Sequence, residues 1–148
     1  MANKSKAVGT RFESAVVKYL REGLDDERPE RLALHGSKDM GDIGHVFAHG
    51  YRGIAECKSH KKVTPGDVAE WRQQTLDERG NSDSDFALLI VNKYNCPMGQ
   101  SQVHVTIRDL ACICLGMRLA TTPKLSELYD DSWVVMDLDQ AIYLMRGV

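Results

Sequence analysis

The sequence lacks any long apolar run. Its longest mainly apolar stretch, Leu110 to Met117, is far shorter than the ~20 residues that a membrane-spanning helix requires. No apolar segment follows the polar residues Met1 to Lys6, so we expect no secretory signal. These absences argue against a membrane protein or a secreted protein and favour the cytoplasm.

Paired metal-binding cysteines are also missing. The four cysteines are Cys57, Cys96, Cys112 and Cys114, and no two of them form a C-x-x-C pair. No histidine stands at a zinc-finger spacing from them, which argues against a structural zinc site. A chain of this length buries enough surface to fold without a disulfide or metal, so we expect reduced, buried thiols.

A strong charge of one sign is absent as well. The chain has 19 Lys and Arg against 21 Asp and Glu, a net charge of −2, which by itself counts against a nucleic-acid partner. The charge is uneven, however: residues 1–66 hold 12 basic and 9 acidic side chains, whereas residues 67–148 hold 7 and 12. The two halves are therefore expected to face different partners, the acidic half away from any DNA.

Periodicity and capping signals predict an α/β fold. Helices are expected over residues 9–22, 64–79, 109–117 and 137–145, and strands over 31–35, 42–49, 54–58, 86–91, 103–107 and 133–136. Residues 50–53 read as the turn of a hairpin. This order predicts one domain with a mixed sheet flanked by helices, comprising a core of about residues 9–108 and a C-terminal helix–strand–helix over 109–148.

Four helices carry start or stop signals. Thr10 is a plausible N-cap with Glu13 completing a capping box, and Gly23 is expected to end that helix. Thr64 followed by Pro65 is a strong helix start. Asp109 and Asp137 are the expected caps of the last two helices.

The residues that suggest chemistry are Asp42, Glu56 and Lys58. Glu56 and Lys58 are two apart on a predicted strand and so project from one face, and Asp42 begins the preceding hairpin strand. Two carboxylates and an ammonium would then converge, an arrangement that is costly unless a partner or metal compensates. Hard Mg²⁺, with Mn²⁺ as a substitute, prefers such oxygen ligands.

These groups fit metal-assisted phosphodiester hydrolysis. Asp42, Glu56 and the Cys57 backbone carbonyl are the expected metal ligands, and Glu13 completes the site if the first helix turns its polar face toward the sheet edge. A metal in this position would activate the attacking water, and Lys58 would orient that water and offset transition-state charge. The less specific interpretations remain open: Glu13 as a capping residue only, Asp42 as a turn residue, and Glu56 with Lys58 as a surface ion pair.

The order of these residues resembles the PD-(D/E)XK nuclease superfamily, and the first half is similar to the archaeal and phage type of Holliday junction resolvase. The resemblance covers about residues 9–75 and rests on Gly9-Thr10-Arg11-Phe12-Glu13, Ser37, Gly41-Asp42-Ile43 and Glu56-Cys57-Lys58. It implies a restriction-endonuclease-like fold, metal-site carboxylates at Glu13, Asp42 and Glu56, and a catalytic Lys58. It also implies a DNA phosphate contact at Ser37 and a site glutamine at Gln73 or Gln74. The motif reads Gly-Asp where the superfamily often has Pro-Asp, and residues beyond 75 have no resolvase-specific match.

A basic rim is expected beside this site. It would comprise Lys38, Arg52, His60, Lys61 and Lys62 with Lys58, extended by Arg11, Lys18 and Arg21 on the first helix. His45, His49 and His60 raise the alternative of a zinc nuclease, but His45 and His49 lie on a predicted strand, too far apart to chelate one ion.

The resulting hypothesis is a Mg²⁺-dependent endonuclease that cuts branched DNA in recombination or repair, in a prokaryotic or phage-infected cell. We expect a homodimer, because symmetric cutting of two strands needs two active sites; the apolar segment Leu110 to Leu119 is either core or dimer surface. The alternatives are a restriction-like or repair nuclease acting on linear duplex, and a non-catalytic DNA-binding module of the same fold.

Overall fold

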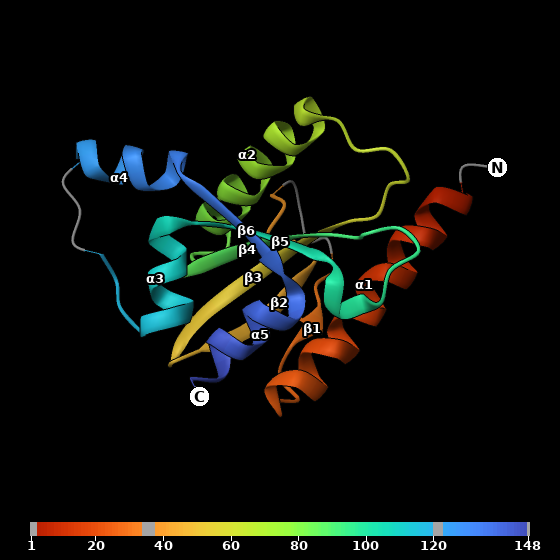
Figure 1. The fold of residues 1–148 in the computed structure, drawn as a ribbon, viewed down its shortest axis with the longest axis horizontal. Coiled ribbons are helices and arrows are strands. Elements are labelled where there is room, and N and C mark those ends of the chain that lie inside the picture. Colours follow the sequence, from red (N-terminus) through yellow and green to blue (C-terminus); the bar gives the residue numbers. More distant parts are fainter. Residues whose placement is uncertain (1–2, 34–37, 120–122, 148) are drawn as a thin grey trace.

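One six-stranded mixed sheet organises the chain in the computed structural model, which describes residues 3–33, 38–119 and 123–147. The strands lie in sequence order, β1 to β6, and within these described residues only the β3–β4 pair is parallel (Figure 1). The strands are β1 (Glu30–Arg31), β2 (Ile43–Ala48), β3 (Tyr51–Lys58), β4 (Phe86–Val91), β5 (Gln102–Thr106) and β6 (Trp133–Asp137). The helices are α1 (Asn3–Leu24), α2 (Pro65–Asn81), η1 (Met98–Gln100), α3 (Ile107–Leu115), α4 (Pro123–Asp131) and α5 (Leu138–Arg146). The expected α/β class, a mixed sheet flanked by helices, is confirmed.

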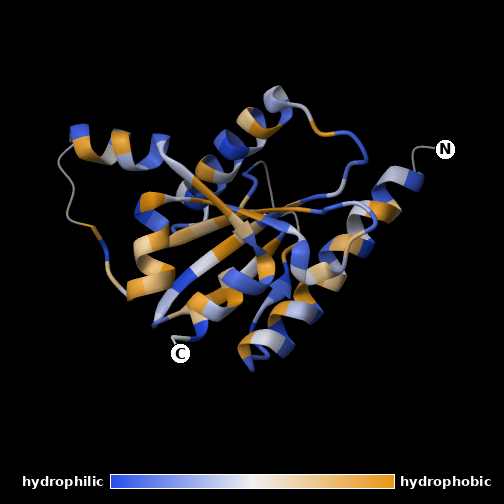
Figure 2. Cartoon of the chain, viewed as in Figure 1, coloured by the Kyte–Doolittle hydropathy of each residue, from blue (hydrophilic) through white to orange (hydrophobic). Residues whose placement is uncertain are grey.

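The core has two layers because the central strands are covered on both faces. All six residues of β4 are buried, as the continuous apolar run over 86–91 predicts. Phe12 and Leu20 of α1, Ile113 of α3 and Ile142 of α5 pack together on one face. Trp71 of α2 packs with Leu89 and Val91 on the other. Hydrophobic residues accordingly lie in the central strands and in parts of the helices that pack on them, such as α3 and α5 (Figure 2).

Helix α2 follows from the parallel pairing of β3 with β4. Two parallel strands cannot be joined by a tight turn, so the chain crosses over through a helix that packs back on the sheet. The start of α2 is as predicted: Thr64 Oγ1 accepts a hydrogen bond from the Asp67 amide at 3.1 Å, and Pro65 opens the helix. The cap of α5 at Asp137 is likewise confirmed, with Gln140 completing a capping box.

Several boundaries differ from those predicted. Helix α1 begins at Asn3, so Thr10 lies inside it and Glu13 has no capping role; it also runs through Gly23 to Leu24. The hairpin turn centres on His49–Gly50, so Tyr51, Arg52 and Gly53 belong to β3 rather than to a turn. The strand predicted over 31–35 is confined to the two residues of β1, and residues 34–35 lie outside the described residues.

The C-terminal part also departs from expectation. Thr106 rather than Asp109 caps α3, because its hydroxyl accepts from the Asp109 amide at 3.2 Å. The Asp109 side chain is instead buried against Arg79 of α2, at 3.0 Å. Helix α4, which has no counterpart among the predicted elements, supplies Asp130 as a second partner of Arg79 at 2.9 Å. The apolar segment Leu110 to Leu119 is partly core and partly surface. Ala111, Cys112 and Ile113 are buried, whereas Leu115 and Met117 are exposed.

The described residues also bear on the cysteines and on membrane-spanning helices. The four cysteines are free thiols, and Cys57 and Cys112 are buried. Every helix within the described ranges is too short or too polar to cross a lipid bilayer.

Candidate metal-binding carboxylate site

The predicted site residues meet where β3 ends and α2 packs across it. Glu56 and Lys58 project from the sheet face that α2 covers, the face opposite Cys57. The Lys58 ammonium lies 3.2 Å from Glu56 Oε1. Glu56 is only 3% exposed, whereas the Lys58 side chain, 19% exposed, reaches solvent. Gln74 of α2 donates from Nε2 to the same Glu56 oxygen at 3.4 Å.

Asp42 is fixed beside this pair by the hairpin. Its amide donates to the Ala55 carbonyl at 3.1 Å, and its Oδ2 accepts from the Cys57 amide at 2.9 Å. Gly41, with φ of +98°, takes a left-handed backbone that other residues rarely adopt, and so turns the chain into β2. The Asp42 carboxyl also interacts with the Glu56 carboxyl. The Cys57 amide thus holds the Asp42 carboxylate in place, and the Cys57 carbonyl as a metal ligand stays a prediction.

Glu13 joins the group from α1. It interacts with the Asp42 carboxyl and forms a 3.1 Å ion pair with Arg31 of β1. Burial and the Asp42 charge raise the pKa of Glu13, and Arg31 opposes this shift. The structure thus brings together all four residues predicted to be catalytic: Glu13, Asp42, Glu56 and Lys58.

Two further carboxylates, which sequence reasoning missed, complete the cluster. Oxygens of Asp39, Glu56 and Glu78 lie within 4.8 Å of one another. Glu78 is 1% exposed. Neither of its oxygens nor Oε2 of Glu56 accepts from an amide, hydroxyl or cationic donor of the described chain, and the Glu78 carboxyl interacts with the carboxyls of Glu56 and Asp39. The signal for Glu78 was its spacing from Trp71 and Gln74, since residues three to four apart share a helix face.

Burial dominates the electrostatics of the cluster. Burial raises the pKa of Glu56 to about 7, with the Asp42 charge adding to the shift and Lys58 opposing it. Burial and the neighbouring Glu56 raise the pKa of Glu78 to about 10. Burial also raises the pKa of Asp42, against the lowering effects of the Cys57 amide and of Lys58. Without a cation, the folded protein therefore holds Glu78 protonated at neutral pH.

The donor set fits a hard divalent cation. All three oxygens that converge are carboxylate oxygens, and several have no hydrogen-bond donor, as expected of atoms built to contact an ion. Two oxygens on one Mg²⁺ lie at most about 4.2 Å apart, twice the usual metal–oxygen distance. Adjacent oxygens on that ion lie about 3 Å apart, so an ion bound here would draw the three oxygens closer together than the 4.8 Å limit within which they lie. Asp39, Glu56 and Glu78 thus form an acidic cluster that could hold a metal ion. Of these three residues, only Glu56 was among the metal ligands predicted from the sequence.

The predicted DNA-binding residues divide into near and remote groups. Gln74 faces the site, whereas Gln73 bonds to Asp77 on the exposed side of α2. His60, Lys61 and Lys62 follow β3 and are exposed, with the His60 ring stacked on Trp71 at 5.1 Å. Lys38, also exposed, lines a small pocket with Asp39 and Asp42.

Arg52, predicted as part of the basic rim, is not in it. It lies six residues before Lys58 on β3, about 20 Å away along the strand, and donates to the carbonyls of Ser82 and Asp83 at 3.1 and 2.9 Å. Arg11 is an exposed residue of α1. Ser37 lies outside the described residues.

The histidine alternative gains no geometric support. His45 pairs with Glu30 at 2.9 Å, and His49 contacts the carbonyls of Ile113 and Leu144, each at 3.1 Å. The two rings therefore have separate partners. Both residues have positive φ, where the backbone departs from a regular strand.

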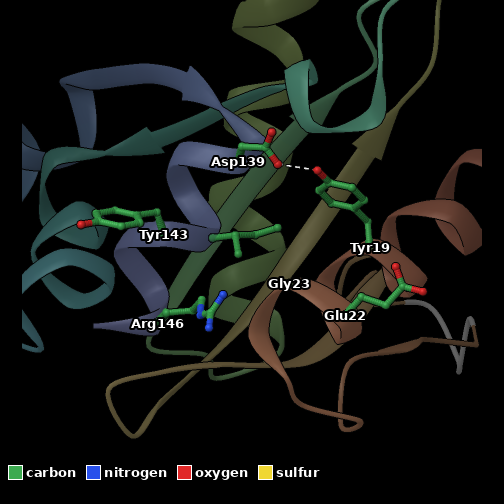
Figure 3. Close-up of a pocket in the computed structure, with 7 residues that line it drawn as sticks. Tyr19, Glu22, Gly23, Asp139, Tyr143 and Arg146 are labelled. Carbon is green, nitrogen blue, oxygen red and sulfur yellow. Dashed lines mark hydrogen bonds between the residues drawn. The ribbon is translucent and has the colours of Figure 1, made fainter. Parts of the chain in front are cut away.

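A further pocket lies away from the carboxylates, between α1 and α5. It has a volume of about 580 Å³ and is lined by Tyr19, Glu22, Gly23, Asp139, Ile142, Tyr143 and Arg146. Figure 3 shows the Tyr19 hydroxyl donating to Asp139 across it. The cavity is open to solvent and brings together no group of metal ligands among the residues that the structure describes.

Comparison with known proteins adds no relative. No protein-family model, curated protein or solved structure matches this chain.

Proposed function

We propose that this protein is a Mg²⁺-dependent endonuclease that hydrolyses phosphodiester bonds in DNA. The observation that carries the proposal is the cluster around Glu56: a carboxylate oxygen buried without a donor, further carboxylates on both sides, and one lysine at the solvent-facing edge. A purely structural role explains this poorly, because holding a buried carboxyl protonated at neutral pH costs stability. A bound cation and an anionic substrate would supply the compensation.

Each residue of the cluster has a proposed role that follows from its position. Glu56, Asp42 and the acids beside them would hold the metal, which polarises the scissile phosphate and lowers the pKa of water when bound. The Cys57 amide and Gln74 hold the Asp42 and Glu56 carboxylates in place through their hydrogen bonds. Lys58 has its ammonium beside Glu56 and access to solvent, so it can orient the attacking water and offset charge on the phosphate.

We further propose a restriction-endonuclease-like fold and a preference for branched DNA. Both rest on the resemblance of residues 9–75 to junction resolvases. Strand β3, helix α2 and the β2–β3 hairpin are consistent with that resemblance, since they place Asp42, Glu56 and Lys58 at one spot. Action as a homodimer belongs to the same part of the proposal.

A cleavage assay tests the proposal. The protein is incubated with a four-way junction, linear duplex and single-stranded DNA, each with Mg²⁺, Mn²⁺ or EDTA. We expect metal-dependent cleavage that Asp42→Asn and Lys58→Ala abolish, while Glu22→Gln, an exposed carboxylate change on α1, leaves it intact. Wild-type protein that cuts no substrate with either metal contradicts the enzyme, and a preference for linear duplex contradicts only the junction specificity.

A further inference from the structure

A groove runs from Lys58 to the first turns of α1. It has a volume of about 450 Å³ and is lined by Lys4, Ser5, Val8, Gly9, Cys57, Lys58, Ser59 and His60. We call these eight residues the entry groove. It adjoins the carboxylate cluster through Lys58, which contacts Glu56.

The groove exists because α1 continues past the sheet. Ser5, Val8 or Gly9, Phe12 and Val16 follow one another at helical spacing, so they share one face of α1. Phe12 and Val16 are buried against the sheet, but Val8 is 43% exposed. The face that packs on the core therefore lies uncovered over the first turns of the helix, beside the β3–α2 connection (Figure 1).

Small residues keep this stretch open. A Cβ built on Gly9 would meet no atom within 4 Å, so the glycine there borders open space. Ser5, one helical turn earlier, is also small. Glycine inside a helix costs up to about 1 kcal/mol relative to alanine, and no close packing at Gly9 offsets this cost. We therefore attribute the glycine at this position to the groove, because any larger side chain would extend into it.

The chemistry of the lining selects an anion. Lys4 and Lys58 supply two ammonium groups, Ser5 and Ser59 supply hydroxyl donors, and none of the eight lining residues is acidic. The cluster next to it is, by contrast, rich in carboxylates. The His60 ring, stacked on Trp71, is held at the rim. This combination of cations and hydroxyls is typical of phosphate contacts along a nucleic-acid backbone.

We propose that the entry groove binds the sugar-phosphate backbone of the DNA strand that leads into the carboxylate site. This inference rests on the proposed function, because it takes the substrate to be DNA. It assigns Lys4, Ser5 and Gly9, at the start of α1, to substrate binding. The scissile phosphate would lie at Lys58 and a neighbouring phosphate at Lys4.

Two matched pairs of variants test it by fluorescence anisotropy on labelled DNA, with Ca²⁺ in place of Mg²⁺. Lys4→Ala is compared with Lys124→Ala, the same charge change at an exposed position of α4 that lies outside the groove lining. Gly9→Leu, which fills the groove and favours the helix, is compared with Ala7→Leu, at an exposed position outside the lining. We expect Lys4→Ala to weaken binding about fivefold and to lower the salt slope by about one. Gly9→Leu should also weaken binding, and neither control should.

The outcomes separate this inference from the proposed function. If the wild type cleaves DNA but Lys4→Ala and Gly9→Leu bind as tightly as their controls, the groove is wrong and the nuclease stands. If both variants weaken binding while the wild type cleaves nothing with Mg²⁺ or Mn²⁺, the groove stands and the enzyme fails. Wild-type protein that binds no DNA overturns the groove. Thermal melts of all four variants check that they fold.

Discussion

Replacing Glu78 by glutamine should stabilise the metal-free protein at neutral pH. Glu78 is 1% exposed and has no donor within reach in the described chain, and its pKa is raised to about 10 by burial and by Glu56. In the unfolded chain a glutamate titrates near pH 4.3. Above that pH the folded state binds a proton that the unfolded state has released, so stability falls as pH rises. A glutamine side chain at this position would fill the same space with no proton to acquire.

The magnitude follows from this linkage and does not depend on how far the pKa is raised above neutrality. Keeping one carboxyl protonated costs about 1.4 kcal/mol for each pH unit above its unfolded pKa. The advantage of Glu78→Gln should therefore grow from roughly 1.5 kcal/mol at pH 5.5 to roughly 4 kcal/mol at pH 7.5. These values are upper bounds, because rearrangement around an ionised Glu78 reduces the cost.

Urea denaturation followed by circular dichroism in EDTA, at pH 5.5 and 7.5, measures the difference. Glu70→Gln is the matched control: it makes the same chemical change at an exposed position of α2 and should alter the free energy of unfolding by less than about 0.5 kcal/mol. A pH-independent difference between Glu78→Gln and wild type would refute the reasoning, as would a less stable variant at pH 7.5. Saturating Mg²⁺ should then stabilise the wild type more than Glu78→Gln, because a ligand stabilises the state that binds it.

Three changes away from the site test the fold. Arg79→Met leaves Asp109 buried without its ion-pair partner and should cost about 3–5 kcal/mol of unfolding free energy in urea titrations; an unchanged midpoint would contradict this. Gly53→Ala places a Cβ 2.2 Å from the Phe86 ring and should cost about 1–3 kcal/mol through overpacking, read as a lower melting temperature. Thr64→Ala removes the hydroxyl that caps α2 and should cost about 1 kcal/mol, a prediction that an unaltered thermal melt would exclude.

Local signals in the sequence predicted the elements whose stability is local. The run Phe86 to Val91 is a strand because six consecutive apolar residues need cover on both faces, and the cap at Thr64 acts within a single turn. The closeness of Asp42, Glu56 and Lys58 was also predictable. Strand alternation puts Glu56 and Lys58 on one face, and a hairpin of this length returns β3 alongside Asp42.

What could not be predicted depends on tertiary packing. Glu13 at the third position after Thr10 has the form of a capping box, but α1 extends to Asn3, through a stretch with too few apolar residues to show a helical stripe. Asp109 looks like a cap by composition, yet it serves as the buried partner of Arg79. The spacing of Glu78 from Gln74 shows that they share a helix face, but only the fold shows that this face packs on Glu56.

The basic first half and the acidic second half of the sequence are not separated in the folded protein. The acidic second half of the chain was expected to face away from DNA, yet Glu78, from that half, lies inside the cluster with Asp39 and Glu56 from the basic half. The site therefore draws carboxylates from both halves, and the cations beside it that reach solvent, Lys58 and Lys4, come from the first half. A divalent ion among the acids would neutralise them locally, while the entry groove beside them holds no acid at all. On the proposed function, DNA binding should depend on this local arrangement rather than on the net charge of −2. Reversing an exposed charge remote from the groove should then change DNA affinity less than the neutral substitution Lys4→Ala does.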